Sequence, residues 1–174
     1  MKRTPIFVLF TMVLITTSTA VQALVGGRWV RAPGNGVVVA SQGGRHSSLI
    51  VCRANYDNGQ HPGKVWDGTC NFGWGGRTIY GANYEVLVDN HYRWVTASTD
   101  GLPPNAVDGG DAGNGAGHVR LGVCEVFNGG DGSWHPGKFY ANKCNYAWGG
   151  SKTNNLGKEL AQSPNGNVHI LVGN

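Results

Sequence analysis

The chain has 174 residues, of which 29 are glycine and only 14% are charged. Its formal charge of +4 includes no cluster of Lys or Arg and no basic helix, which argues against nucleic acid or an anionic membrane as the main partner. The length suits one domain, and the abundant glycine indicates tight turns between short strands.

The first 23 residues have the pattern of a secretory signal peptide. Lys2 and Arg3 precede an apolar stretch over residues 6–15, and a small-residue cleavage pattern ends at Ala23. The stretch is too short to cross a bilayer, and no later stretch approaches the ~20 apolar residues required. Cleavage removes two of the 14 basic residues and leaves 12 against 10 acidic ones. We therefore predict a secreted or periplasmic protein without a membrane span.

Short runs rich in Val, Ile or Leu and bounded by Gly, Asn or Asp are typical of strands. They cover residues 36–40, 48–52, 84–88, 119–124 and 168–172. No window of helical length shows convincing apolar spacing of 3.6 residues. The sequence predicts an all-β fold of short antiparallel strands.

Two parts of the chain carry the same motifs in the same order. His-Pro-Gly-Lys occurs at 61–64 and 135–138, and Cys-Asn followed by Trp-Gly-Gly occurs at 70–76 and 144–150. Units of roughly 60 to 80 residues in only two copies do not suit a solenoid. We predict two pseudo-symmetric repeats, residues 24–90 and 91–174, which form one domain with a shared core. Insertions between the motifs are expected in loops.

Each repeat contains two cysteines, and an exported chain favours disulfides over a metal site. Repeat symmetry alone does not choose among the three connectivities. The midpoints between the cysteines of each pair, His61 and Trp134, lie close to Pro-Gly dipeptides, and a hairpin turning there would bring each pair face to face. The predicted disulfides are Cys52–Cys70 and Cys124–Cys144.

Lys64 and Lys138 occupy the same place after Pro-Gly in each repeat. A repeated lysine is usually a solvated charge on an edge strand. Beside a carboxylate, however, an ammonium suits sugar hydroxyls, because the carboxylate accepts their hydrogen bonds and the ammonium donates to them. A sugar also needs an aromatic wall, for which the non-recurring Trp66 and Trp134 are candidates.

The recurring Trp74 and Trp148 are expected in the core instead, because they accompany glycines that define the fold.

Enzyme and metal sites find little support. His61 and His135 recur, but a His-Pro-Gly turn accounts for them, and no nucleophile motif is present. The oxygen-rich segments 108–114 and 129–132 complete no calcium loop. We predict no catalytic residue, no metal and no cofactor.

Together, the Trp-Val openings, the Gly-Gly pairs, the Pro-Gly-Lys motifs, the Trp-Gly-Gly motifs and the Tyr84-Glu85-Val86-Leu87 segment resemble the DM9 repeat family over nearly the whole chain after residue 23. The best-known members are mannose-binding lectins of bivalves, built from two tandem all-β repeats, and related repeats occur on natterin-like pore-forming proteins. In those lectins an Asp after Gly-Gly and the Lys of Pro-Gly-Lys hold the sugar. The resemblance implies Asp111 and Lys138 for these roles.

The first repeat departs from that pattern. Arg45 follows its Gly-Gly pair, so Lys64 lacks the implied acidic partner. Arg53-Ala54 is replaced by Glu125-Val126 in the second repeat, and both repeats have Cys where the family often has Gly. One intact sugar site is implied.

The sequence therefore predicts a secreted, non-enzymatic, carbohydrate-binding protein with a mannose-type glycan as partner. Asp111 and Lys138 form its main site, and Lys64, His135 and Trp134 are further candidates. The alternative is a protein-interaction or toxin-associated module of the cell envelope or host interface, although the long amphipathic hairpin of a pore-former is missing. A second copy of the chain, forming a homodimer, is a further candidate partner.

Overall fold

The structure is a computed structural model that describes residues 24–35, 37–41, 44–46, 48–89, 91–113, 119–150 and 157–174. The predicted signal peptide lies outside the described residues. Every helix or strand in these ranges is a β-strand, which confirms the all-β prediction. Within them, no helix is long and apolar enough to span a membrane.

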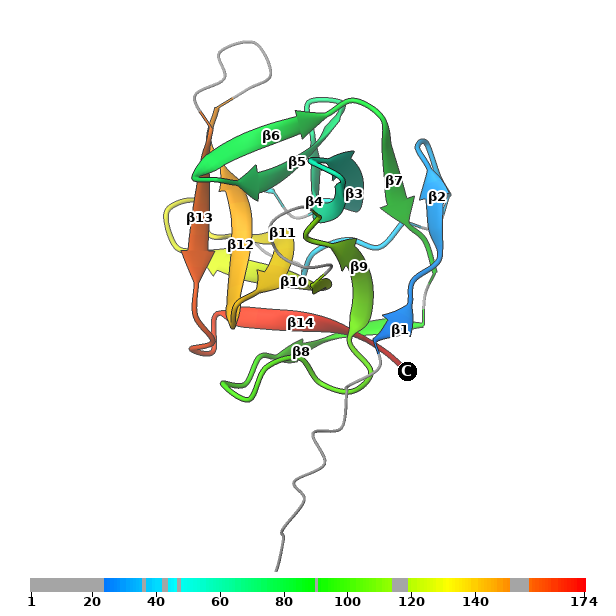
Figure 1. The fold of residues 1–174 in the computed structure, drawn as a ribbon. Coiled ribbons are helices and arrows are strands. Elements are labelled where there is room, and N and C mark those ends of the chain that lie inside the picture. The colour runs from blue at the N-terminus through cyan, green and yellow to red at the C-terminus, as the bar shows by residue number, and fades with distance from the viewer. Residues whose placement is uncertain are drawn as a thin grey trace, which may run out of the picture.

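Within the described residues, fourteen strands form one sheet, which curls around the centre of the molecule (Figure 1). They are β1 (Val25–Gly26), β2 (Trp29–Arg31), β3 (Val51–Tyr56), β4 (Gly59–Trp66), β5 (Thr69–Trp74), β6 (Arg77–Gly81), β7 (Tyr84–Leu87), β8 (Tyr92–Thr96), β9 (Val107–Asp111), β10 (Arg120–Asn128), β11 (Ser133–Tyr140), β12 (Lys143–Trp148), β13 (Lys158–Gln162) and β14 (Val168–Gly173). The predicted runs at 84–88, 119–124 and 168–172 correspond to β7, β10 and β14. In the run at 36–40, the described residues Val37 and Val39 form isolated bridges.

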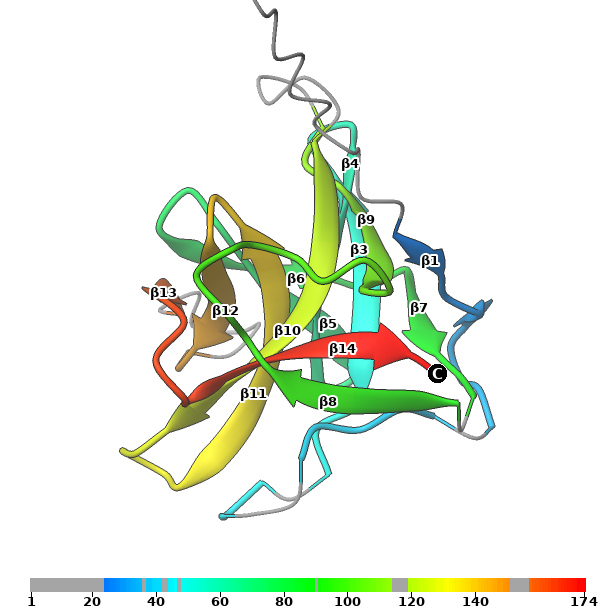
Figure 2. The same ribbon diagram turned by 90° about the horizontal axis from the view of Figure 1, so that it is seen from below.

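The two halves of the chain pair their strands in the same order. In the first half β3, β4, β5 and β6 pair in sequence, and β7 pairs with both β3 and β2. In the second half β10, β11, β12 and β13 pair in sequence, and β14 pairs with both β10 and β8. Figure 2 shows β8 and β14 side by side. The exact repeat boundaries and the pseudo-twofold axis remain predictions.

Tryptophans at matching positions connect the halves. The indole of Trp29 donates to the backbone oxygen of Asp108 at 3.2 Å, and the indole of Trp94 donates to that of Val39 at 3.2 Å. A central apolar cluster also draws on both halves. Its buried members are Val51, Leu87, Val107, Val123 and Leu171.

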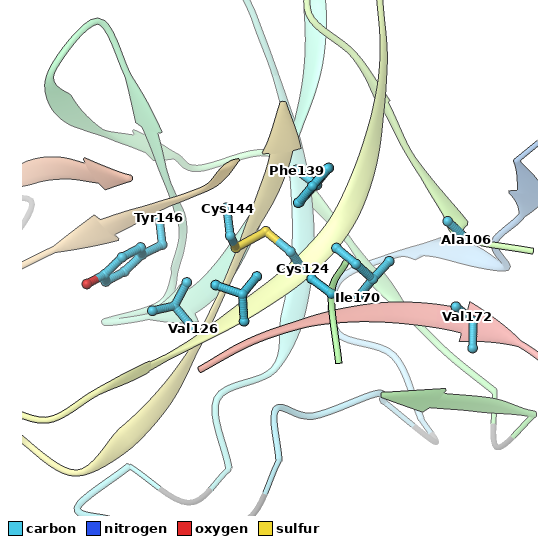
Figure 3. Close-up of a cluster of buried hydrophobic side chains, with 10 residues drawn as sticks. Ala106, Cys124, Val126, Phe139, Cys144, Tyr146, Ile170 and Val172 are labelled. Atoms are coloured by element: carbon cyan, nitrogen blue, oxygen red, sulfur yellow. A yellow bond between two sulfur atoms is a disulfide. The ribbon is translucent and has the colours of Figure 1, made fainter. Parts of the chain in front are cut away.

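Two further clusters surround the disulfides, which join Cys52 to Cys70 and Cys124 to Cys144 as predicted. Figure 3 shows the second disulfide between β10 and β12, with Phe139 and Ile170 nearby. The curled sheet thus has a shared centre and one disulfide-centred core in each half.

The predicted turns at His61 and Trp134 are wrong, because both residues lie inside strands, β4 and β11. The first hairpin turns earlier, at Asp57 and Asn58, whose φ angles of 48° and 56° are typical of a tight hairpin turn. Each disulfide therefore connects strands that flank a third strand: β3 and β5 around β4, and β10 and β12 around β11.

This arrangement requires sharp curling. The Cα atoms of Cys52 and Cys70 are 5.8 Å apart, whereas strands two places apart in a flat sheet lie about 9.5 Å from each other. Gly63 allows the close approach, because a Cβ atom there would lie 2.2 Å from the backbone oxygen of Asn71. On β4, the pairing with β5 covers only residues 64–66. Pro62 lies outside this stretch, so its lack of a backbone N–H removes no hydrogen bond from it.

The replacement of Arg53 in the first repeat by Glu125 in the second has a structural explanation. Arg53 pairs across the sheet with Glu85, its Nε atom 2.7 Å from a carboxylate oxygen. At the matching pair of strands, Glu125 faces His169, with 2.8 Å between Nδ1 and a carboxylate oxygen. Each half thus pairs an acid with a basic side chain across two neighbouring strands. The acid lies on β7 in the first half and on β10 in the second.

Candidate functional site

Both Pro-Gly-Lys lysines are buried and lie within strands. Lys64 and Lys138 are 7% and 4% exposed, so the expectation of solvated edge charges does not hold. Each lysine pairs in register with the Asn of its Cys-Asn motif, Asn71 or Asn145, where the glycine before it allows close packing.

Each lysine crosses to the opposite half of the molecule. Lys64 Nζ donates to the backbone oxygen of Ala147 at 2.7 Å, and Lys138 Nζ donates to that of Gly73 at 2.6 Å. Gly73 and Ala147 both precede the Trp of a Trp-Gly-Gly motif. The two lysines therefore occupy equivalent sites where the halves meet.

Lys138 lies among the groups that a sugar site needs. Its Nζ atom is 3.6 Å from a carboxylate oxygen of Glu159 and 4.7 Å from the ring centre of Trp74. Burial lowers the pKa of Lys138, and Glu159 opposes this shift. These side chains and the half-exposed Tyr140 line a cavity of about 370 Å³.

The position of Glu159 depends on a missing side chain. Its second carboxylate oxygen accepts from the backbone N–H of Gly76 at 2.9 Å. A Cβ atom on Gly73 would lie 2.4 Å from Cγ and 2.9 Å from Cβ of Glu159. The glycine therefore leaves the space through which this acid from the second half reaches Lys138.

We expect the substitution Gly73→Ala to lower the free energy of unfolding by about 1–3 kcal/mol, because the added methyl group overpacks against Glu159. Urea denaturation measures this effect. Ala147→Gly, at the equivalent position, is the matched control and should lose only about 0.5–1 kcal/mol. A loss for Gly73→Ala below that of the control would contradict the packing argument.

Lys64 has a different environment. Its Nζ atom is 2.6 Å from Nδ1 of His135, and Nε2 of His135 is 3.0 Å from a carboxylate oxygen of Asp131. The ring of Trp148 lies 6.0 Å from the ammonium. These residues line a cavity of about 190 Å³, with the exposed Trp66 also in its wall.

Burial controls the protonation of this cluster. It lowers the pKa of Lys64 to about 7, against the opposing effect of Asp131. Burial, followed by the charge of Lys64, also lowers the pKa of His135 to about 4, and Asp131 again opposes the shift. His135 is therefore neutral at pH 7.

The equivalent histidine, His61, makes no corresponding hydrogen bond to lysine. Its Nε2 atom lies 3.0 Å from the backbone oxygen of Tyr56, and its buried Nδ1 atom has no hydrogen-bond partner among the described residues. Burial, then the charge of Lys138, lowers the pKa of His61 to about 4, while Asp111 has a smaller raising effect.

The remaining predicted residues lie at different places. Asp111 ends β9 beside the β3–β4 hairpin, where its carboxylate accepts from the N–H of Gly113 at 2.9 Å. Ala112, the next residue, lines the Lys138 cavity. Trp134 stacks on His169 with ring centres 4.1 Å apart and is not among the residues that line either lysine cavity.

Three parts of these clusters were not predicted from the sequence. Asp131 had a usable signal, since it precedes His135 by four residues at the hairpin. Trp74 and Trp148 recur, but they were assigned to the core and not to the lysines. Glu159 carries no local signal, because it reaches Lys138 only through the pairing of β12 with β13 and the packing on Gly73.

Fold and site together define a disulfide-linked β-sheet binding or interaction module. Residues 43–124 match the DM9 repeat family. This confirms the resemblance seen in the motifs. No curated protein matches the chain.

Among solved structures, the chain is similar to the nematode sperm cell motility protein MFP2B, with a TM-score of 0.51 and 18% sequence identity. The likeness covers 84% of this chain and 41% of that one, so the chain spans less than half the length of MFP2B. At this identity the comparison shows a shared fold alone.

Proposed function

We propose that this protein is an exported, non-enzymatic carbohydrate-binding protein that holds a mannose-type glycan in the Lys138 cavity. The observation that carries the proposal is the meeting of an ammonium, a carboxylate and aromatic rings in one cavity. Lys138 donates to sugar hydroxyls, Glu159 accepts from them, and Trp74 and Tyr140 offer apolar walls.

Electrostatics support the assignment of Lys138. The ammonium uses one donor on Gly73 and has others for Glu159 and a ligand. Asp111 lies next to Ala112 in the cavity wall and is the second acid of the proposed site. Export is supported by the two disulfides, which are typical of oxidising compartments.

A glycan array followed by calorimetry with mannose tests the proposal. Lys138→Gln and Glu159→Gln should each weaken binding by about 10- to 100-fold, as expected for loss of a hydrogen bond to a charged group. Asp111→Asn should weaken it as well. Lys64→Gln, at the equivalent position, is the matched control and should change affinity less than about threefold.

Absence of glycan binding by the wild-type protein contradicts the proposal. So does unchanged affinity in both Lys138→Gln and Glu159→Gln when circular dichroism shows them folded. A protein captured from envelope or host extracts in excess free mannose would favour the interaction module instead.

A further inference from the structure

Lys64 is placed as a nucleophile, unlike its counterpart Lys138. Its Nζ atom has two hydrogen-bond acceptors among the described residues, Nδ1 of His135 and the backbone oxygen of Ala147. A neutral amine donates two hydrogens to these acceptors and keeps a lone pair in the remaining tetrahedral direction. The hydrogen bonds therefore satisfy the uncharged form.

The tautomer of His135 follows from its two neighbours. The carboxylate of Asp131 only accepts hydrogen bonds, so Nε2 of His135 carries the hydrogen that it donates at 3.0 Å. Nδ1 then presents its lone pair to Lys64 at 2.6 Å. Asp131, His135 and Lys64 thus form the order of orienting acid, base and nucleophile that activates a side chain.

Lys138, at the equivalent position in the other half, has no such series of acid, base and nucleophile. Glu159 stands opposite Ala147 in the β12–β13 ladder, whereas Thr78 stands opposite Gly73 in the β5–β6 ladder. Glu159 extends to Lys138 and favours its charged form. Thr78 offers no charge to Lys64, and burial favours the neutral amine there.

We propose that Lys64 binds a small aldehyde covalently and reversibly, as an imine formed in the cavity between Trp66 and Trp148. The amine lone pair attacks the carbonyl carbon, and Nδ1 of His135 takes one proton from the nitrogen and gives it to the carbonyl oxygen, which becomes a hydroxyl group. Nδ1 then transfers the second proton of the nitrogen to this hydroxyl group, which leaves as water, and a C=N bond remains. One aldehyde and one amine yield one imine and one water.

The cavity defines the class of aldehyde. Its volume of about 190 Å³ is below the ~300–1,000 Å³ typical of drug-sized ligands. Leu49 and the two tryptophans provide apolar wall, while His46 and Asp131 face the same space, with 3.8 Å between His46 Nε2 and an Asp131 oxygen. A compact aldehyde with a planar apolar body fits this lining.

Reductive trapping tests the proposal. The folded protein is incubated at pH 7 with benzaldehyde and sodium cyanoborohydride, and peptide mass spectrometry maps the adducts. An amine with a pKa of about 7 is half neutral at that pH, about 10³ times the neutral fraction of an ordinary lysine. Allowing for restricted access, we expect Lys64 to react at least about tenfold faster than the exposed Lys143 and Lys158.

Matched variants separate activation from mere exposure. His135→Gln should slow trapping at Lys64 by at least about tenfold, whereas His61→Gln should leave the rate unchanged. Glu159→Thr places at Lys138 the uncharged residue that Thr78 provides in the other half. Because the charged form of Lys138 loses its carboxylate partner, trapping at Lys138 should become faster.

Trapping at Lys64 no faster than at Lys143 and Lys158 in the folded wild type would overturn the proposal, as would an unchanged rate of trapping at Lys64 in folded His135→Gln. The result is independent of glycan binding. Lys64→Arg should abolish the adduct and retain affinity at the Lys138 cavity.

Discussion

Acidification from pH 7 to pH 4 is expected to lower the free energy of unfolding by about 6 kcal/mol through two buried histidines. His61 and His135 are 0% and 2% exposed, and each has a pKa of about 4 in the folded protein against ~6.5 in an unfolded chain. Between these values the unfolded chain binds protons that the folded protein does not, so stability falls as the pH falls. Each shift corresponds to about 3 kcal/mol.

Two other groups also affect how the free energy of unfolding depends on pH. Burial raises the pKa of Glu125, so this group binds a proton more readily in the folded state and offsets part of the acid loss. The lowered pKa of Lys64 acts above pH 7, where stability should continue to rise until about pH 10.

Urea denaturation at pH 7, 6, 5 and 4 measures the effect. His61→Gln and His135→Gln should each remove about half of the acid loss. His91→Gln is the control, because this side chain is 76% exposed and both buried histidines remain. Equal stability at pH 4 and pH 7, or the full loss in the His61→Gln/His135→Gln double variant, would show that the histidines do not limit acid stability.

The second large effect concerns the disulfides. They close loops with sequence separations of 18 and 20 residues, and the loss of chain entropy in the unfolded state predicts about 3 kcal/mol for each. All four sulfur-bearing side chains are buried, so alanine is the appropriate replacement. Removal of both disulfides should cost about 6 kcal/mol, comparable with the ~5–15 kcal/mol that stabilises a typical domain.

Urea denaturation of the two Cys-pair variants and of the four-alanine variant measures these losses. Reduction of the wild type should reproduce the four-alanine result, and reductant should have no effect on that variant. A loss below about 1 kcal/mol for either pair would be incompatible with the loop-entropy argument.

Local pattern and composition were sufficient for the class of fold. Val-rich runs between glycines correctly predicted β7, β10 and β14, and the repeated cysteine spacing led to the observed disulfides. The reason given for that pairing was nevertheless wrong. Pro-Gly usually marks a turn, but Gly63 here allows close packing within a curled strand, which depends on the neighbouring Asn71.

For the two lysines as well, the sequence predicted one part of the site and the tertiary structure decided the rest. Repetition identified Lys64 and Lys138 as equivalent, and both occupy the junction of the halves. Their partners were not predictable from spacing, because Lys64 meets His135 and Lys138 meets Glu159 only after the two halves pack together. The resemblance implied Asp111 as the acid for Lys138, and that sugar contact stays a prediction.

The sequence alone determined the all-β class and the two equivalent lysines, because strand patterning and repeated motifs are properties of the chain itself. It also indicated the observed disulfide pairs, although the turns predicted between the cysteines were wrong. Only the tertiary structure decided that these lysines differ. A carboxylate reaches Lys138 through the space left by Gly73, while Lys64 is buried against a neutral imidazole. Burial and the distance to a counter-charge determine the protonation of an amine, and both depend on residues that are remote in the sequence.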